Sequence, residues 1–79
     1  MDVSTAVICE LLRAVTEKDV QEEDVTLESR YLEDLGLTSI QLVDLVMAIE
    51  ERFNVEIEDV DLAKLRTVGQ TVDYLKQKT

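Results

Sequence analysis

The middle of the chain carries the strongest helical pattern of apolar residues. Over residues 39–53, apolar positions recur at spacings of three and four, as they do on the faces of an α-helix. One set of positions is Ile40, Val43 and Met47, a second set is Leu45, Val46, Ile49 and Phe53, and Leu42 lies between the two. Thr38 and Gln41 form a capping-box pattern, so we expect this helix to begin near Ser39 and to end at Asn54.

The segment before residue 19 has the same period on a single face. It predicts a helix from Ser4 or Thr5 to about Lys18, with Cys9 off the centre of the apolar face. The residues on that face are Val7, Ile8, Leu11, Leu12 and Val15.

Two helices are expected after residue 57. A short, weak helix over residues 58–65 would turn Val60, Ala63 and Leu65 inward. Thr67 and Gln70 repeat the capping pattern, which predicts a last helix from residue 68 to about residue 76. The inward residues of that helix are Val68, Val72 and Leu75.

The connection from Asp19 to Thr38 lacks a helical period but remains rich in apolar residues, which can pin it across the helix ends. These residues are Val20, Val25, Leu27, Tyr31, Leu32, Leu35 and Leu37. Gly36 allows a tight turn with positive φ before the cap. The pattern as a whole predicts an all-α protein, a small antiparallel four-helix bundle with three long helices, one short helix and a long first loop.

Length and composition limit the chain to one small folded domain, taken as residues 1–79, with no proline and two glycines. No apolar run approaches the roughly 20 residues of a membrane span, and the N-terminus lacks a basic-then-apolar signal segment. We therefore expect a cytoplasmic monomer without stable membrane insertion. The single Cys9 has no partner for an internal disulfide, which agrees with a reducing compartment.

Several function classes are excluded by what the chain lacks. There is no histidine, so Ser39 and Cys9 have no usual base to activate them as nucleophiles, and we expect no catalytic residues and no enzyme. Zinc sites need several Cys or His ligands, so no metal site is predicted. A net charge of −10 opposes binding to nucleic acid.

The central helix is too apolar for all of its stripes to face one small core. We assign Leu45, Val46, Ile49 and Phe53 to the core, and the stripe of Ile40, Val43 and Met47 to a partner. The acids Asp44, Glu50 and Glu51 on the same helix would complete this partner-binding surface. Because acids far outnumber Arg52, the one basic residue between residues 44 and 61, the expected partners have basic docking surfaces.

The residues around Ser39 resemble a known family. Asp-Leu-Gly-Leu-Thr-Ser-Ile at residues 34–40, followed by Val-Asp-Leu-Val-Met at residues 43–47, is similar to the signature of acyl carrier proteins. The long first loop, the Glu56-Ile57 step and the closing Asp-Tyr-Leu segment also fit, so the resemblance covers nearly the whole chain. One position departs, because Thr38 stands where the family usually has aspartate.

The resemblance implies that Ser39 carries a covalent 4′-phosphopantetheine arm, which holds acyl intermediates as thioesters for fatty-acid or polyketide biosynthesis. The implied partners are a phosphopantetheinyl transferase, acyltransferases, ketosynthases and related acyl-processing enzymes. Two alternatives stay open. One is a peptidyl or aminoacyl carrier of the same fold, which the missing acid at Thr38 suggests; the other is an acidic helical interaction module without a prosthetic group.

Overall fold

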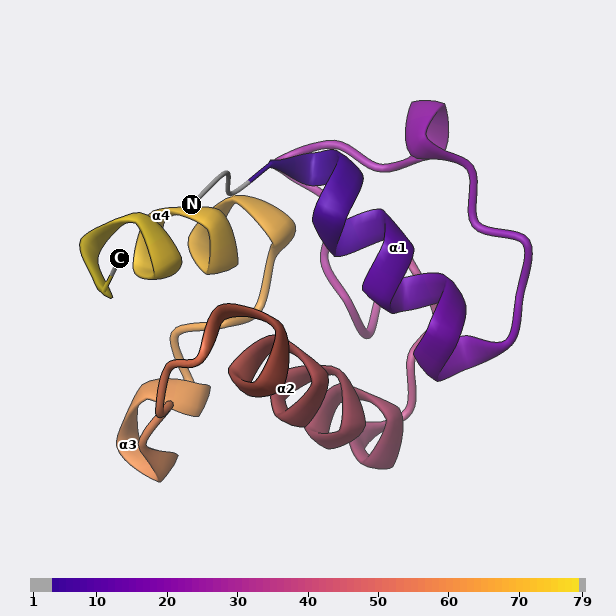
Figure 1. Ribbon diagram of the computed structural model, residues 1–79. Helices are drawn as coiled ribbons and strands as arrows, with labels where there is room; N and C mark the ends of the chain where they lie inside the picture. Colours follow the sequence, from indigo (N-terminus) through magenta and orange to yellow (C-terminus); the bar gives the residue numbers. More distant parts are fainter. Residues whose placement is uncertain (1–3, 79) are drawn as a thin grey trace.

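The computed structural model describes residues 4–78, and the outermost residues of the expected domain, 1–3 and 79, lie outside the described part. The elements are α1 (Thr5–Thr16), a 3₁₀ turn η1 (Glu22–Asp24), α2 (Ser39–Phe53), α3 (Asp59–Leu62) and α4 (Val68–Lys78). The protein is all-α, as predicted, with three long helices and one short one (Figure 1). In the described residues, the only β-type pairing is an isolated bridge between Arg30 and Thr67.

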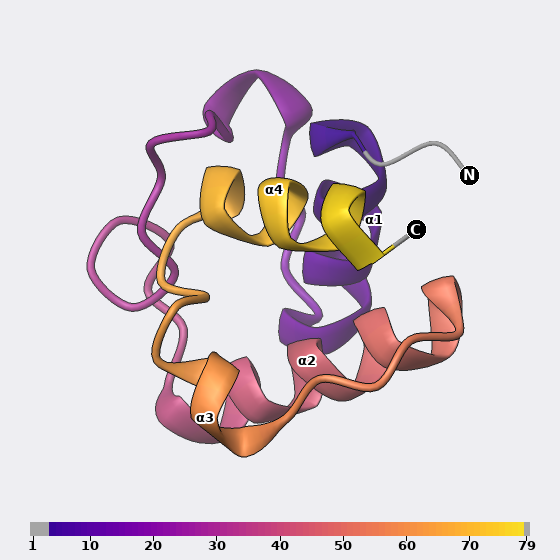
Figure 2. The same cartoon turned by 90° about the vertical axis from the view of Figure 1, so that its left-hand side faces the viewer.

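The three long helices enclose the core. Helix α1 contacts both α2 and α4. The short helix α3 lies on the far side of α2 from α1, an arrangement that both views show (Figure 2). The long first loop passes around the end of the bundle and reaches the start of α2.

The predicted core residues of the central helix are buried, because this side of α2 faces α1. Leu45 and Ile49 are almost fully inaccessible, and Val46 and Phe53 lie beside them. In α4 the buried residues include the predicted Val68, Val72 and Leu75. Both capping predictions are confirmed, and α2 ends at Asn54 in the left-handed conformation, as expected.

Helix α1 departs from its prediction in two respects. It ends at Thr16 rather than near Lys18, because Glu17 adopts a left-handed conformation with φ 58° and donates its backbone N–H to the Arg13 carbonyl at 2.9 Å. Cys9 is fully buried rather than off the centre of the apolar face. The reason is tertiary: α1 is covered by two helices, so its buried side is wider than one stripe.

The first loop is ordered around buried anchors, but two of its expected anchors face water. Val25, Tyr31 and Leu37 are buried, whereas Leu27 and Leu32 are exposed, at 55% and 48%. The η1 turn was not predicted, since three acidic residues show no period. Gly36 has φ +71°, which confirms the predicted positive φ.

Helix α3 is shorter than predicted and presents a different face. Val60 is 74% exposed and Ala63 is exposed, whereas Leu62 is half-buried and Leu65 is buried. The helix stops after four residues because the next turn is closed by i→i+3 hydrogen bonds, from the Lys64 amide to Asp61 and from the Leu65 amide to Leu62. This tighter turn brings Leu65, rather than Val60 and Ala63, into the core. Helix α4 runs two residues further than predicted, to Lys78.

Candidate functional site

Ser39 is the first residue of α2, and its side chain is exposed. Thr38 caps the helix: its Oγ1 accepts from the Gln41 amide at 3.1 Å, and its own amide donates to Gln41 Oε1 at 3.0 Å. The Leu42 amide donates to the Thr38 carbonyl at 3.0 Å. The amides of Ser39 and Ile40 therefore have no acceptor within the helix, and they lie at the positive end of its dipole.

The chain enters this cap along a fixed path. The buried Leu37 donates its amide to the Tyr31 carbonyl at 2.9 Å, and Gly36 turns the backbone with φ +71°. An alanine Cβ at Gly36 would meet no atom within 4 Å, so glycine is needed there for backbone conformation and not for space. The position of the Ser39 hydroxyl thus follows from anchors on both of its sides.

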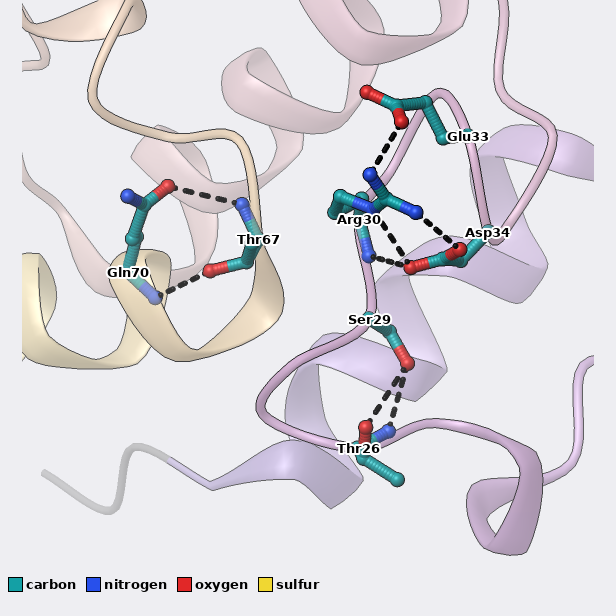
Figure 3. A network of polar contacts seen from close by, with 7 residues as sticks. All are labelled: Thr26, Ser29, Arg30, Glu33, Asp34, Thr67 and Gln70. Carbon is teal, nitrogen blue, oxygen red and sulfur yellow. Dashed lines mark hydrogen bonds and ion pairs between the residues drawn. The ribbon is translucent and has the colours of Figure 1, made fainter.

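Asp34, the acid of the motif, has a structural role. Its carboxylate accepts from the Arg30 backbone amide at 2.9 Å and from the Arg30 guanidinium at 3.2 and 3.3 Å, and Glu33 forms an ion pair with the same guanidinium (Figure 3). The hydrogen bonds from Arg30 hold the pKa of Asp34 below its usual range. The sequence analysis did not predict this cluster, because its residues close a turn in the first loop, which has no helical period.

The same turn is joined to the start of α4. The Tyr31 amide donates to the Arg66 carbonyl at 3.0 Å, and the Val68 amide donates to the Ser29 carbonyl at 3.0 Å. The Gly69 amide reaches the Leu27 carbonyl at 2.8 Å. Figure 3 shows these two segments side by side, with Thr67 and Gln70 across from Arg30. The loop before Ser39 is therefore built against α4 as well as against the core.

The predicted partner-binding stripe is exposed. Ile40, Val43 and Met47 are 75%, 51% and 58% exposed, and Leu42 is half-buried beside them. Val60 of α3, which was expected to point inward, is a further exposed apolar residue. Its exposure depends on where α3 ends, and the sequence pattern did not predict that end.

The predicted acids divide into two kinds. Asp44 and Glu51 are exposed. Glu50 is half-buried, and its carboxylate accepts from the Ile57 amide at 2.9 Å, so it also holds the connection that follows α2. Asp44 and Glu51 are therefore the freer acids of the predicted surface.

A cavity of about 590 Å³ opens one helical turn from Ser39. Four leucines line it, of which Leu42 comes from α2 and Leu62 from α3, together with polar residues of the first loop and the start of α4. The lining residues are Arg30, Leu32, Glu33, Leu42, Leu62, Leu65, Arg66, Thr67 and Gln70. A group attached at Ser39 could reach this cavity, since residues three apart lie on the same side of a helix.

Other chemistries find little support in residues 4–78. Cys9 is buried and its Sγ donates to the Val20 carbonyl at 3.7 Å; burial raises the pKa of this thiol, which opposes a thiolate. No three His, Cys, Asp or Glu side chains converge as metal ligands within this part of the chain. Among the helices described, none is both long and apolar enough to cross a membrane.

Comparison with known proteins identifies the family. Residues 6–75 match the family model described as "Phosphopantetheine attachment site". The chain is 47% identical to an acyl carrier protein of Wolinella succinogenes over 62 residues, which cover 78% of this chain and 82% of the relative.

Solved structures give the same fold. A provisionally assigned acyl carrier protein of Anaplasma phagocytophilum is 33% identical, with a TM-score of 0.81, and the match covers 95% of this chain and 86% of that one. A second, from Mycobacterium tuberculosis, has a TM-score of 0.82 at 21% identity, covering 95% and 97%, and it supports the fold alone.

Proposed function

The chain belongs to the acyl carrier protein family, and from that premise we propose that Ser39 is the residue that carries its 4′-phosphopantetheine. The observation that carries the proposal is the exposed Ser39 hydroxyl at the capped start of α2. No protein group in the described residues occupies this hydroxyl by a hydrogen bond. It is therefore free to form the phosphodiester.

The surroundings of Ser39 suit a phosphate. The unpaired amides of Ser39 and Ile40 and the helix dipole favour an anion at this end of α2. The nearest acid of the motif, Asp34, has its charge compensated by Arg30. Thr38, which stands where the family usually has aspartate, keeps the cap and adds no negative charge beside the attachment point. The residues present thus fit the group.

We assign a carrying role and no catalysis to this chain. During attachment the Ser39 oxygen forms a bond to the phosphorus of the phosphopantetheinyl group, the pyrophosphate bond of coenzyme A breaks, adenosine 3′,5′-bisphosphate leaves, and the serine proton passes to a base. A phosphopantetheinyl transferase must supply that base, because the chain has no histidine. Once attached, the arm supplies a thiol that holds an acyl group as a thioester, and tethering raises its effective concentration at partner enzymes.

Attachment is tested with a broad-specificity phosphopantetheinyl transferase and coenzyme A. Intact-mass measurement should show one added phosphopantetheinyl group on the wild type and none on Ser39→Ala. Ser4→Ala is the matched control, since Ser4 is a serine at the start of another helix, where it is the N-cap of α1 and makes no side-chain capping hydrogen bond, and this variant should be modified like the wild type. Modification of Ser39→Ala at another residue would refute the assignment.

We further propose that the partner-binding face of α2 consists of Ile40, Val43, Asp44, Met47, Glu50 and Glu51. Its apolar residues supply contact area, and its acids attract basic surfaces of the transferase, acyltransferases and ketosynthases. Asp44 lies about one and a half turns beyond Ser39, close to where the arm leaves the protein. Methionine in this stripe suits a surface that several partners share.

Charge reversals test this face. Asp44→Lys and Glu51→Lys should slow modification by the transferase, mostly through the association rate, and the effect should shrink as salt rises. Glu22→Lys and Glu23→Lys, exposed in the distant η1 turn, are the controls and should have much smaller effects. Met47→Ala should weaken transfer with little change in salt dependence. Equal losses from the η1 and α2 reversals would mean that net charge alone matters.

The remaining assignments complete the proposal. Residues 1–79 form a single carrier domain that acts as a cytoplasmic monomer in fatty-acid or polyketide biosynthesis. The net charge of −10 supports basic protein partners over nucleic acid or anionic membranes.

A further inference from the structure

The cavity beside Ser39 is not uniformly apolar. Leu42 of α2 and Leu62 of α3 line it, and Leu32 and Leu65 extend this leucine lining. Arg66, Thr67 and Gln70, at the start of α4, supply a polar part of the wall. An alkyl chain would match the leucines and leave this polar part without partners. The cavity therefore has two chemically different parts.

In the polar part, the side-chain oxygens already accept hydrogen bonds from the protein, whereas the side-chain N–H groups donate none to the described part of the chain. Gln70 Oε1 accepts from the amides of Arg66 and Thr67 at 2.9 and 3.1 Å, and Thr67 Oγ1 accepts from the Gln70 amide at 3.1 Å. Within residues 4–78, neither the side-chain NH₂ of Gln70 nor the guanidinium of Arg66 has a protein partner. This part of the wall therefore offers N–H groups to an oxygen acceptor.

The two arginines of the cavity differ in charge compensation. Arg30 is held by Glu33 and by Asp34 (Figure 3). Arg66 makes no ion pair in the part of the chain that the structure describes. Its guanidinium is thus a locally uncompensated positive charge in a protein whose net charge is −10. An oxygen acceptor that bears negative charge gains most from such a group.

We propose that the cavity receives acyl chains with an oxygen at the end distal to the thioester, and that Arg66 favours a carboxylate there over a plain alkyl end. The leucines contact the methylene segment, while Arg66 and Gln70 donate to the distal oxygen. The preferred cargo is thus an ω-carboxyacyl group. This inference rests on the proposed attachment at Ser39.

The test compares cargoes matched in length. The protein is loaded from coenzyme A thioesters with octanoyl, with its ω-carboxyl counterpart suberyl, or with its (ω−1)-keto counterpart, and intact mass verifies each product. The rate of thioester cleavage by hydroxylamine is then measured relative to the same acyl group on free pantetheine. We expect the protein to protect suberyl about threefold better than octanoyl, a modest factor because Arg66 is exposed. The keto chain should fall between them.

Arg66→Gln should bring the suberyl-to-octanoyl protection ratio to about one while octanoyl protection stays unchanged. Lys76→Gln is the matched control, since Lys76 is exposed on α4 and does not line the cavity, and it should keep the wild-type ratio. Equal or better protection of octanoyl by the wild type, or an unchanged ratio in Arg66→Gln, would overturn the inference while leaving the carrier function intact. Failure of Ser39 to load at all would instead overturn the attachment site, and this inference with it.

Discussion

The first loop and the α3 segment are both irregular connections, yet they are held in different ways. The first loop, residues 17–38, buries Val25, Tyr31 and Leu37. Backbone hydrogen bonds join it to the start of α4, and Tyr31 also donates its hydroxyl to Thr71 Oγ1 at 2.7 Å inside the core. The α3 segment, residues 54–65, buries Ile57 and Leu65 on either side of its helix, but the helix itself has no buried residue and no side-chain cap.

Two hydrogen bonds made by side chains connect the α3 segment to α4 and α2. Tyr74 donates to Asp61 at 2.8 Å, and the Glu50 carboxylate accepts from the Ile57 amide at 2.9 Å. Local stability follows buried apolar contacts and protected backbone hydrogen bonds, so the first loop should open far less often than α3. The difference places rigidity before Ser39 and leaves a more easily displaced wall on the cavity beside it.

Truncating one anchor in each region should give the largest contrast. Tyr31→Ala removes an aromatic side chain that is 1% exposed and should lower the free energy of unfolding by about 3–5 kcal/mol. Val60→Ala, at an exposed position on α3, should change it by less than about 0.5 kcal/mol. Urea unfolding measures both values. If the two substitutions lowered the free energy of unfolding by similar amounts, the two regions would not differ in how firmly they are held.

The contact between the first loop and α4 can be tested at a glycine. A Cβ at Gly69 would lie 2.7 Å from the Leu27 carbonyl oxygen, so Gly69→Ala should destabilise the protein by about 1–3 kcal/mol, despite the better helix propensity of alanine. Gly36→Ala should cost about 1 kcal/mol for its positive φ alone. Thermal unfolding compares the stabilities of the two variants. If Gly69→Ala is more stable than the wild type, the first loop can move away from the added methyl group at low cost.

Tyr74→Phe sharpens the comparison from the side of α3. It removes the hydrogen bond to Asp61 and keeps the ring, so amide exchange in α3 should quicken by about twofold to tenfold. Exchange at the Leu37 and Val68 amides, which bond to the Tyr31 and Ser29 carbonyls, should stay as in the wild type. Hydrogen–deuterium exchange with residue resolution makes the measurement. Faster exchange in both regions would mean that they open together.

The smallest expected effect is on how thermal stability depends on pH. Arg30 lowers the pKa of Asp34, so this carboxylate stabilises the fold above its ordinary pKa, and the contribution fades as pH falls through the lowered folded value. Asp34→Asn should therefore melt below the wild type at neutral pH and approach it on acidification. Thermal unfolding across the carboxyl titration range tests this. If the difference in melting temperature between Asp34→Asn and the wild type does not change with pH, Asp34 does not contribute to the acid sensitivity of the first loop.

Local signals in the sequence were sufficient to predict the helix start at Ser39, the residue that we propose as the attachment site. The Thr38–Gln41 cap, the Asn54 end and the turn at Gly36 each involve residues within a few positions of one another, so their chemistry is readable without the fold. The division of α2 into a buried and an exposed side was also predictable, because a helix repeats its faces every few residues. These features bring Ser39 to the surface at a helix start.

Contacts between distant segments decided the rest. Burial of Cys9, exposure of Val60 and Leu27, and the early end of α3 depend on which element covers each residue. The hydrogen bonds from Tyr31 to Arg66 and from Gly69 to Leu27 join residues far apart in the chain, and no period records such pairs. The cavity arises in the same way, since its leucines and its uncompensated Arg66 come from separate elements that only the folded chain brings together. Sequence alone therefore determined that Ser39 stands at a capped helix start, and tertiary structure determined which residues line the cavity beside it.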